Sequence, residues 1–183
     1  MPHPPSRYLA AGPRVAIRPF RLEDGPEFTA RAGQSKDLHR PWLFPPDTDK
    51  AYADYAGRLL EDPARAGFLV CEKDSGDIAG FININNIVRG GFQSGALGYG
   101  VFAHAAQRGL MREGMELVIA YAFGPLGLHR LEINAQPGNT ASIALARSAG
   151  FRLEGLSPKM IYVDGAWRDH ERWALTVEMR SGR

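Results

Sequence analysis

The residues Gly98-Tyr99-Gly100-Val101-Phe102 are followed, after four further residues, by Gln107-Arg108-Gly109-Leu110-Met111-Arg112, and this stretch decides the fold. Its first half lies in a predicted strand, Ala96–Phe102. Its second half opens a predicted helix, Leu110–Phe123, whose apolar side chains recur at helical spacing. A helix N-terminus attracts anions through its free N–H groups, and a glycine there lets the backbone approach a phosphate closely. Taken alone, the stretch fits either a phosphate-binding loop or an ordinary strand–helix turn with exposed arginines.

Outward from this stretch, hydrophobic periodicity and turn residues predict further strands and helices. The predicted strands are Arg14–Phe20, Gly67–Lys73, Ile78–Ile87, Ala96–Phe102, His129–Gln136, Arg152–Val163 and Arg168–Glu178, and the predicted helices are Glu23–Gly33, Lys50–Glu61, Leu110–Phe123 and Asn139–Ala149. Leu38–Thr48 holds three prolines and is expected to be a loop. Early hairpins give antiparallel pairs, and a later strand–helix–strand crossover can give a parallel pair. We therefore predict an α+β fold (an α/β sandwich) with a mixed, mostly antiparallel central sheet of about seven strands and about four flanking helices.

Composition limits the classes of function. The chain has 183 residues, a formal net charge of +2 and one cysteine. The length fits one domain (residues 1–183), the small charge does not support nucleic-acid binding, and one cysteine cannot form an internal disulfide or a cysteine-based metal cluster. The N-terminus lacks the apolar core of a signal peptide and no segment is apolar enough to span a membrane, so we expect a cytoplasmic protein with no metal site. Residues 1–6 are rich in proline and are expected to be flexible.

Several motifs, in order, resemble a known family. The stretch from Gly98 to Arg112 is similar to the acetyl-CoA motif of the GNAT superfamily of N-acetyltransferases, whose pattern is Gln/Arg-x-x-Gly-x-Gly/Ala. Aligned on Gly109, the ends of this pattern fall on Ala106 and Met111, and both depart from it. Met at the last position is a habit of one subgroup, the ribosomal-protein-alanine (RimJ/RimL-type) N-acetyltransferases. Other segments are similar to the same subgroup: Pro41-Trp42, Leu126–Glu132, Asn139–Ile143, Gly150–Gly155 and Asp164–His170.

The resemblance, which runs from Arg14 to Thr176, implies how a site would be organised. In the family, two adjacent strands splay apart, here the fourth and fifth predicted strands, and backbone N–H groups beside the splay bind the thioester carbonyl of acetyl-CoA. The residues expected to bind this cosubstrate are Val101, Phe102, Gln107, Arg108, Gly109, Leu110, Met111, Arg112, Asn139 and Ser142. Because Ala106 has no polar side chain, we expect backbone amides with Arg108 and Arg112 to hold the diphosphate. Trp42, Asn134 and Tyr162 are expected on the acceptor side.

Ser142, Tyr99 and Glu132 are the candidate catalytic residues. The resemblance implies that the Ser142 hydroxyl lies near the CoA sulfur, where it could protonate the leaving thiolate. Tyr99 and Tyr162 are weaker candidate acids. Glu132, Asn134 and Glu72 could relay a proton through water. Each also has a plain structural interpretation, as a helix-start residue, a half-buried aromatic and a solvated strand residue. Asn139 is likewise a good helix N-cap.

No general base stands out in the sequence. An α-amine of pKa about 7.8 is roughly a quarter neutral at pH 7.4, against about 0.1% for a lysine amine, so an N-terminal acceptor asks little of a base. Asp169 and His170 have no further metal ligands at a suitable spacing, and we expect a structural or acceptor-side role for them.

Three hypotheses for function remain open. The first is an acetyl-CoA-dependent N-acetyltransferase, a monomer or homodimer, that acts on the N-terminal α-amine of a ribosomal protein without a nucleic-acid or membrane partner. The second keeps acetyl-CoA but changes the acceptor to an amino acid, a polyamine or an aminoglycoside, because one fold can serve several acceptors. The third is a non-catalytic acyl-CoA-binding module, supported only by the departures at Ala106 and at Gly114, where a mid-helix glycine costs about 1 kcal/mol.

Overall fold

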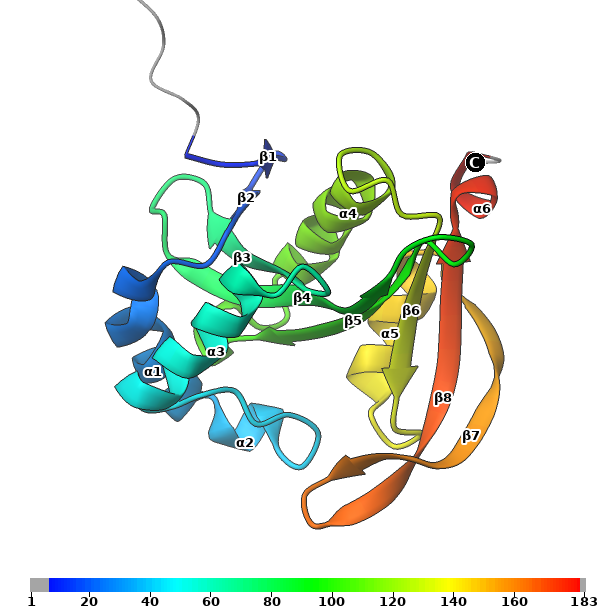
Figure 1. The fold of residues 1–183 in the computed structure, drawn as a ribbon. Helices are drawn as coiled ribbons and strands as arrows, with labels where there is room; N and C mark the ends of the chain where they lie inside the picture. Colours follow the sequence, from blue (N-terminus) through cyan, green and yellow to red (C-terminus); the bar gives the residue numbers. More distant parts are fainter. Residues whose placement is uncertain (1–6, 182–183) are drawn as a thin grey trace, which may run out of the picture.

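A computed structural model describes residues 7–181 and contains one eight-stranded sheet with helices on both faces (Figure 1). The strands are β1 (Ala10–Ala11), β2 (Val15–Arg18), β3 (Ala66–Glu72), β4 (Ile78–Val88), β5 (Ser94–Val101), β6 (Arg130–Ala135), β7 (Arg152–Val163) and β8 (Ala166–Thr176). The helices are α1 (Gly25–Gln34), α2 (Lys36–His39), α3 (Asp49–Glu61), α4 (Leu110–Phe123), α5 (Thr140–Ser148) and α6 (Val177–Ser181), with short 3-10 turns at Leu22–Asp24 and Ala103–Ala105. The expected flexibility of residues 1–6 concerns a segment outside the described residues.

The predicted fold class is confirmed, with two local corrections. All seven predicted strands and four predicted helices are present, and the additional strand is the two-residue β1. Leu38 and His39 were predicted to be loop residues, but they form the end of the short helix α2. The last strand was predicted to reach Glu178, but β8 ends at Thr176 because its partner β6 begins at the paired residue, Arg130. Beyond that pair the chain has no strand to continue against and turns into α6.

The sheet is antiparallel except where β5 and β6 run side by side. These two strands pair in parallel from Ser94↔Arg130 to Leu97↔Ile133, and their pairing stops there. Beyond Leu97, β5 continues against β4 as far as Val101, while β6 continues against β8 as far as Ala135. The two strands therefore diverge, which is the predicted splay between the fourth and fifth predicted strands.

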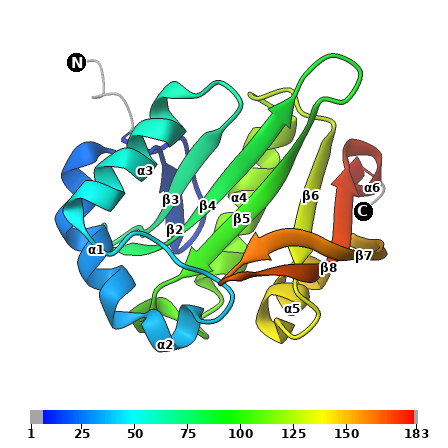
Figure 2. The same ribbon diagram turned by 60° about the horizontal axis from the view of Figure 1, so that its bottom comes forward.

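Two hydrophobic cores lie on opposite faces of the sheet (Figures 1 and 2). One contains residues of α4 and α5 together with alternate residues of β3 such as Phe68 and Val70. The other contains aromatic residues of α1 and α3, and the intervening β3 residues Leu69 and Cys71. Alternate residues of a strand point to opposite faces, so one strand feeds both cores. The single cysteine is a fully buried core residue and forms no disulfide.

Gly114 lets α4 approach the sheet closely. A Cβ atom at this position would lie 2.8 Å from both Cγ atoms of Val70, closer than carbon atoms pack. The branched valine cannot rotate away freely because its χ1 angle is stiff. The glycine that departs from the usual pattern is therefore explained by helix–sheet packing, and it gives no support to a non-catalytic chain.

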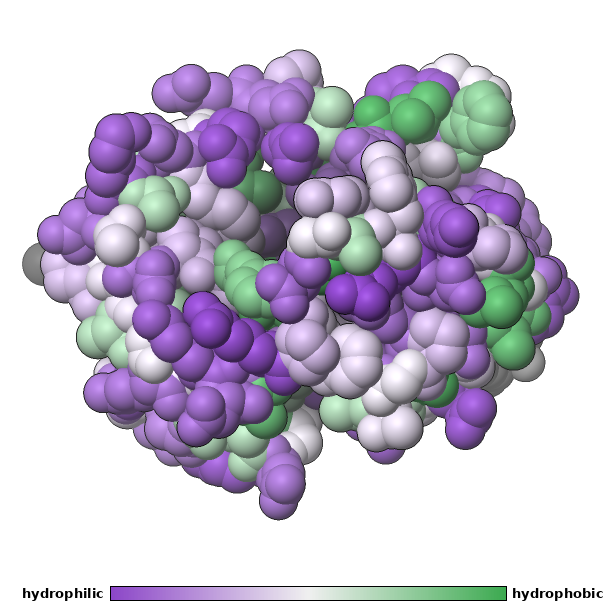
Figure 3. All heavy atoms as spheres, turned by 90° about the horizontal axis from the view of Figure 1, so that it is seen from below, coloured by the Kyte–Doolittle hydropathy of each residue, from purple (hydrophilic) through white to green (hydrophobic). Residues whose placement is uncertain are grey.

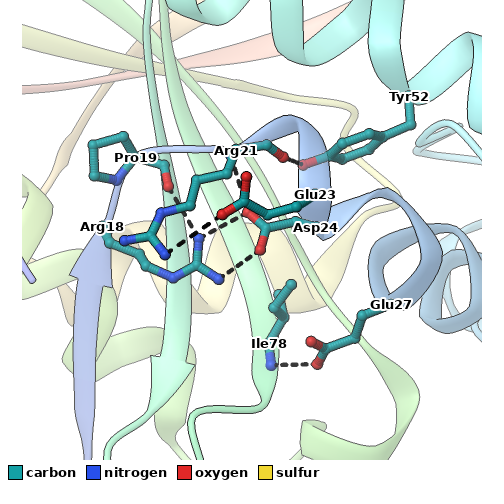
Figure 4. A network of polar contacts seen from close by, with 8 residues as sticks. All are labelled: Arg18, Pro19, Arg21, Glu23, Asp24, Glu27, Tyr52 and Ile78. Atoms are coloured by element: carbon teal, nitrogen blue, oxygen red, sulfur yellow. Dashed lines mark hydrogen bonds and ion pairs between the residues drawn. The ribbon is translucent and has the colours of Figure 1, made fainter. Parts of the chain in front are cut away.

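A buried polar network fixes where α1 begins (Figure 4). The guanidinium of Arg18 on β2 donates to both carboxylate oxygens of Asp24 at 2.8 Å, and both residues are buried. The same carboxylate accepts the backbone N–H of Arg21, whose carbonyl oxygen accepts the hydroxyl of Tyr52 from α3. Removing one partner of a buried ion pair leaves an uncompensated charge, so this network holds α1 and α3 firmly against the sheet. It also sets the position of α2, which follows α1 directly.

Candidate active site

A cavity of about 270 Å³ lies where β5 and β6 diverge. Its lining comes from α2 and the loop after it, the last residues of β5 and β6, the loop after β6, the first turn of α4, the first two turns of α5, and one residue of β8. The lining residues are Leu38, His39, Trp42, Leu43, Gly98, Tyr99, Gly100, Val101, Met111, Ile133, Asn134, Ala135, Gln136, Asn139, Ala141, Ser142, Leu145 and His170. From below, the side on which α2 and the turn of the β7–β8 hairpin lie, the surface is hollowed and its rim is mostly hydrophilic (Figure 3).

Tyr99 and Ser142 meet on one side of this cavity. The Tyr99 hydroxyl oxygen lies 2.8 Å from Oγ of Ser142 and 3.2 Å from the Ser142 carbonyl oxygen. Burial raises the pKa of Tyr99 to about 12, so the phenol keeps its proton at neutral pH and remains a hydrogen-bond donor. Asn139 caps α5, since its side-chain oxygen accepts the backbone N–H of Ser142 at 3.2 Å. The cap fixes the first turn of α5 and with it the position of Ser142.

Asn134 and His170 lie on the opposite face of the sheet from Tyr99. Asn134 pairs with Arg172, and directly paired residues share a face. His170 is two residues from Arg172 on β8 and therefore shares that face as well. Tyr99 is two residues from Leu97, whose partner is Ile133, so it lies on the other face. The cavity thus opens to both faces of the sheet, with a phenol and a hydroxyl toward one and an amide and an imidazole toward the other.

The backbone of Val101 faces the splay and is held in place by α2. The N–H of Phe102 donates to the carbonyl oxygen of Ala79 on β4. In a strand, the N–H and C=O of one residue point to the same side, and those of the next residue point to the opposite side. The N–H and C=O of Val101 therefore point away from β4. The carbonyl oxygen accepts a hydrogen bond of 2.7 Å from Nε2 of the buried His39. Burial lowers the pKa of His39, which keeps the ring neutral. Ser35, directly before α2, makes a second hydrogen bond to the end of β5, because its hydroxyl oxygen accepts the N–H of Ala103 at 2.9 Å.

Trp42 and Leu43 bring the loop after α2 across the splay. The Trp42 ring lies 3.0 Å from the position that a Cβ atom on Gly138 would occupy, beyond the end of β6. Leu43 lies 2.5 Å from the corresponding position on Gly100 of β5. These two glycines therefore admit the two side chains that cover the cavity.

The loop before α4 ends at Gly109, where the first backbone N–H groups of the helix begin. Gly109 is the N-cap in a left-handed conformation (φ 74°), and Gln107 also has a positive φ of 58°. The N–H groups at the start of a helix have no acceptor within the helix, so this end can bind an anion. Met111, in the same turn, borders the cavity. The loop and the cavity are therefore adjacent, so one extended ligand could place a phosphate at the loop and its other end in the cavity.

The two arginines of this loop differ in their surroundings. Arg108 makes a two-pronged ion pair with Glu72 of β3, at 2.7 and 2.8 Å, which holds the pKa of Glu72 below its usual value. Arg112 is exposed and has no ion-pair partner within residues 7–181. A third cation, Arg14, donates to the carbonyl of Arg108 at 2.8 Å and to Glu113 at 3.0 Å.

Eight of the fifteen predicted site residues do not line the cavity: four belong to the loop before α4 and its first turn (Gln107, Arg108, Gly109 and Arg112), and the others are Phe102, Leu110, Tyr162 and Glu132. Phe102 is fully buried against Phe28 and Phe81, and its N–H already bonds to Ala79, so neither its side chain nor its N–H is free for a cosubstrate. Tyr162 is 59% exposed on the β7–β8 hairpin, where it packs on Trp167. Glu132 lies further back along β6 and is paired with Arg130 at 2.8 Å. Leu110 is buried in the core and could offer only its backbone N–H.

His39, Leu43 and Arg14 are site residues that the sequence did not predict. His39 and Leu43 lie in the segment expected to be a loop, and nothing in the sequence places them beside β5. Arg14 stands almost a hundred positions before the residues that it contacts. Its only signal in the sequence was its place at the start of a predicted strand.

Two further features of the described residues bear on function. No helix formed by residues 7–181 is long and apolar enough to cross a membrane. No group of three or more histidine, cysteine, aspartate or glutamate residues in the same range is arranged to hold a metal ion.

Comparison with known proteins identifies the family. Residues 14–152 match the family model described as "Acetyltransferase (GNAT) domain". The chain is 36% identical over 171 residues to the ribosomal protein uS5-alanine N-acetyltransferase of Escherichia coli (strain K12), covering 90% of this chain and 88% of that protein. It is 28% identical over 176 residues to the probable N-acetyltransferase YjcK of Bacillus subtilis (strain 168), covering 91% and 96%.

A solved structure agrees with these relatives. Mycobacterium smegmatis RimJ in complex with CoA-disulfide superposes with a TM-score of 0.84 at 27% identity, covering 91% of this chain and 87% of that chain. The family match spans most of the chain, and the splayed sheet, the cavity beside it and the loop before α4 are all present. The chain therefore belongs to the GNAT family and is an N-acetyltransferase.

Proposed function

We propose that this enzyme transfers the acetyl group of acetyl-CoA to the N-terminal α-amine of a ribosomal protein. The observation that carries the acceptor class is the uncharged lining of the cavity. Among the described residues that line it there is no aspartate, glutamate, lysine or arginine. A polyamine or an aminoglycoside carries several positive charges, and burying them without carboxylates is costly. A peptide N-terminus enters with one amine, which must in any case be neutral to react.

Two further observations support acetyl-CoA as the acetyl donor. The free N–H groups at the start of α4 and the cation of Arg112 suit the diphosphate, and the cavity continues from Met111 to Ser142 along a path that suits the pantetheine arm. The superposable RimJ structure is a complex with CoA-disulfide. The relative of 36% identity acts on an alanine of ribosomal protein uS5, according to its name.

The proposed chemistry divides between the two faces of the sheet. The amine nitrogen attacks the thioester carbon, a C–N bond forms, and the C–S bond breaks. The N–H of Val101, which points into the splay, would stabilise the oxygen of the thioester carbonyl as it gains charge. The Tyr99–Ser142 pair, whose hydroxyl oxygens lie 2.8 Å apart beside the cavity, would give the leaving sulfur its proton.

The acceptor claim is tested with three amines: a peptide that begins with alanine and contains a lysine, the same peptide with its N-terminus blocked, and spermidine. At pH 7.4 an α-amine of pKa about 7.8 is roughly 28% neutral and a lysine amine about 0.1%, so we expect kcat/KM for the free peptide to exceed both others by about a hundredfold or more. Mass spectrometry of the products locates the acetyl group. Faster acetylation of spermidine than of the free peptide would refute the proposed acceptor.

The leaving-group role is tested by Tyr99→Phe. We expect kcat to fall by about a hundredfold while the KM for acetyl-CoA changes little, because the hydroxyl acts on the departing sulfur rather than in binding. The release of the CoA thiol measures the rate. Tyr121→Phe is the matched control, since this tyrosine packs on Phe68 outside the cavity. Wild-type kcat in Tyr99→Phe would exclude the phenol as the proton donor.

The phosphate loop is tested by charge changes at Glu72 and Arg112. Glu72→Gln removes the carboxylate that occupies Arg108, so CoA should bind about twofold to fivefold more tightly, and Arg112→Ala should weaken binding by a similar factor. Calorimetric Kd values at low and high salt measure both effects, which should shrink as salt rises.

Glu116→Gln is the control for Glu72→Gln, since it makes the same charge change on α4 at a residue that pairs with Arg180. Arg112→Ala makes the opposite charge change and is compared with wild type. If Glu72→Gln does not differ from its control and Arg112→Ala does not differ from wild type, the diphosphate does not sit on the loop.

A further inference from the structure

Two histidines border the cavity, and their hydrogen bonds give the two rings opposite tautomers. Nε2 of His39 donates to the carbonyl of Val101, so the lone pair of the neutral ring is on Nδ1. Nδ1 of His170 lies 3.0 Å from the carbonyl oxygen of Arg168. Since a carbonyl oxygen can only accept, Nδ1 of His170 carries a hydrogen, which in the neutral form of the ring leaves the lone pair on Nε2.

The two lone pairs differ in access. Nδ1 of His39 is sealed from solvent and has no partner, so no acceptor amine can reach it. Nε2 of His170 has no hydrogen-bond partner within residues 7–181, and it is not among the sealed ring nitrogens, which belong to His39 and His104. The residue as a whole is only 4% exposed, and it borders the cavity. The cavity is therefore the space from which Nε2 is reached.

The position of His170 matches the acceptor side of the reaction. On β8 it stands one residue beyond the last pair with β6, Ala135↔Glu171, where β6 ends and the cavity begins. It shares the sheet face of Asn134, opposite the face of Tyr99. An acyl transfer needs a proton donor beside the sulfur and a proton acceptor beside the amine, on opposite sides of the carbonyl carbon. The two faces of the splay provide this separation.

We propose that His170 is the general base of the transfer, an inference that rests on the acetyl transfer proposed above. As the amine nitrogen bonds to the carbonyl carbon, its proton passes to Nε2 of His170. As the C–S bond breaks, the sulfur takes a proton from the Tyr99–Ser142 pair. The hydrogen bond from Nδ1 to Arg168 orients the ring and fixes its tautomer. Glu132, one of the relays considered from the sequence, is paired with Arg130 and lies outside the cavity.

His170→Asn separates the chemical role from a structural one. The asparagine amide can still donate to the Arg168 carbonyl, but it has no lone pair in place of Nε2. We expect kcat to fall by about a hundredfold, with the Kd for CoA unchanged, measured with whichever amine the wild type acetylates fastest. Exogenous imidazole should restore part of the kcat of His170→Ala.

Asp169→Ala is the structural control for this experiment. It removes the contact of the Asp169 carboxylate with the N–H of Lys159 within the same hairpin, outside the cavity. Its kcat should stay within about twofold of wild type, as for most surface substitutions. A kcat of His170→Asn equal to that of Asp169→Ala would overturn the proposal.

The tautomer gives a test that does not depend on activity. Long-range ¹H–¹⁵N NMR spectra of the wild-type protein should show the proton of His170 on Nδ1, and a proton on Nε2 instead would overturn the proposal. The acceptor proposal and the base proposal fail on different results. A preference for spermidine refutes the peptide acceptor and leaves the role of His170 to be tested. His170→Asn and wild type are then compared with spermidine as the acceptor.

Discussion

The structure of the site depends on one event in the sheet, the end of pairing between β5 and β6 after Leu97↔Ile133. Each strand keeps its outer partner beyond this point, so neither is free to bend back and close the gap. The peptide groups of the last β5 residues then face a space instead of a strand. A buried backbone group must find a partner elsewhere, and the Val101 carbonyl finds it in His39, while the Val101 N–H stays directed into the splay. The divergence of two strands thus produces both the cavity and the N–H group that we propose as the donor to the thioester oxygen.

The elements around the splay serve to hold it in this form. The buried Arg18–Asp24 pair anchors the start of α1, and the tightly linked α2 then reaches the end of β5 through Ser35 and His39. The Asn139 cap holds Ser142 at the first turn of α5, within reach of Tyr99. Gly114 lets α4 pack closely on Val70, which fixes the helix whose N-terminal amides are the proposed diphosphate site. The residues that hold the splay are far apart in the sequence, and the fold brings them together.

The sequence predicted the elements well because the strands and the long helices have clear periodicity and clear turn residues. Its errors have physical causes. The short helix α2 has too few residues for a periodic pattern, and β8 ended early because its partner ended, which no local signal reports. Tyr99, Ser142, Asn139 and Trp42 were selected through the resemblance of their motifs to the family and do border the cavity, although their roles remain predictions. His39 and the accessible nitrogen of His170 could not be predicted, because a tautomer is set by contacts with distant or buried backbone carbonyls.

The central claim is that the splay holds the reacting atoms, with the sulfur on the Tyr99–Ser142 side and the amine on the Asn134–His170 side. A crystal structure with a bisubstrate analogue, in which CoA is joined through an acetyl bridge to the α-amine of an alanyl peptide, tests it most directly. The account predicts the sulfur within hydrogen-bond reach of the Tyr99 or Ser142 hydroxyl, the carbonyl oxygen at the N–H of Val101, and the amide nitrogen facing His170. An analogue bound with its sulfur and carbonyl outside the space between β5 and β6 would contradict the account.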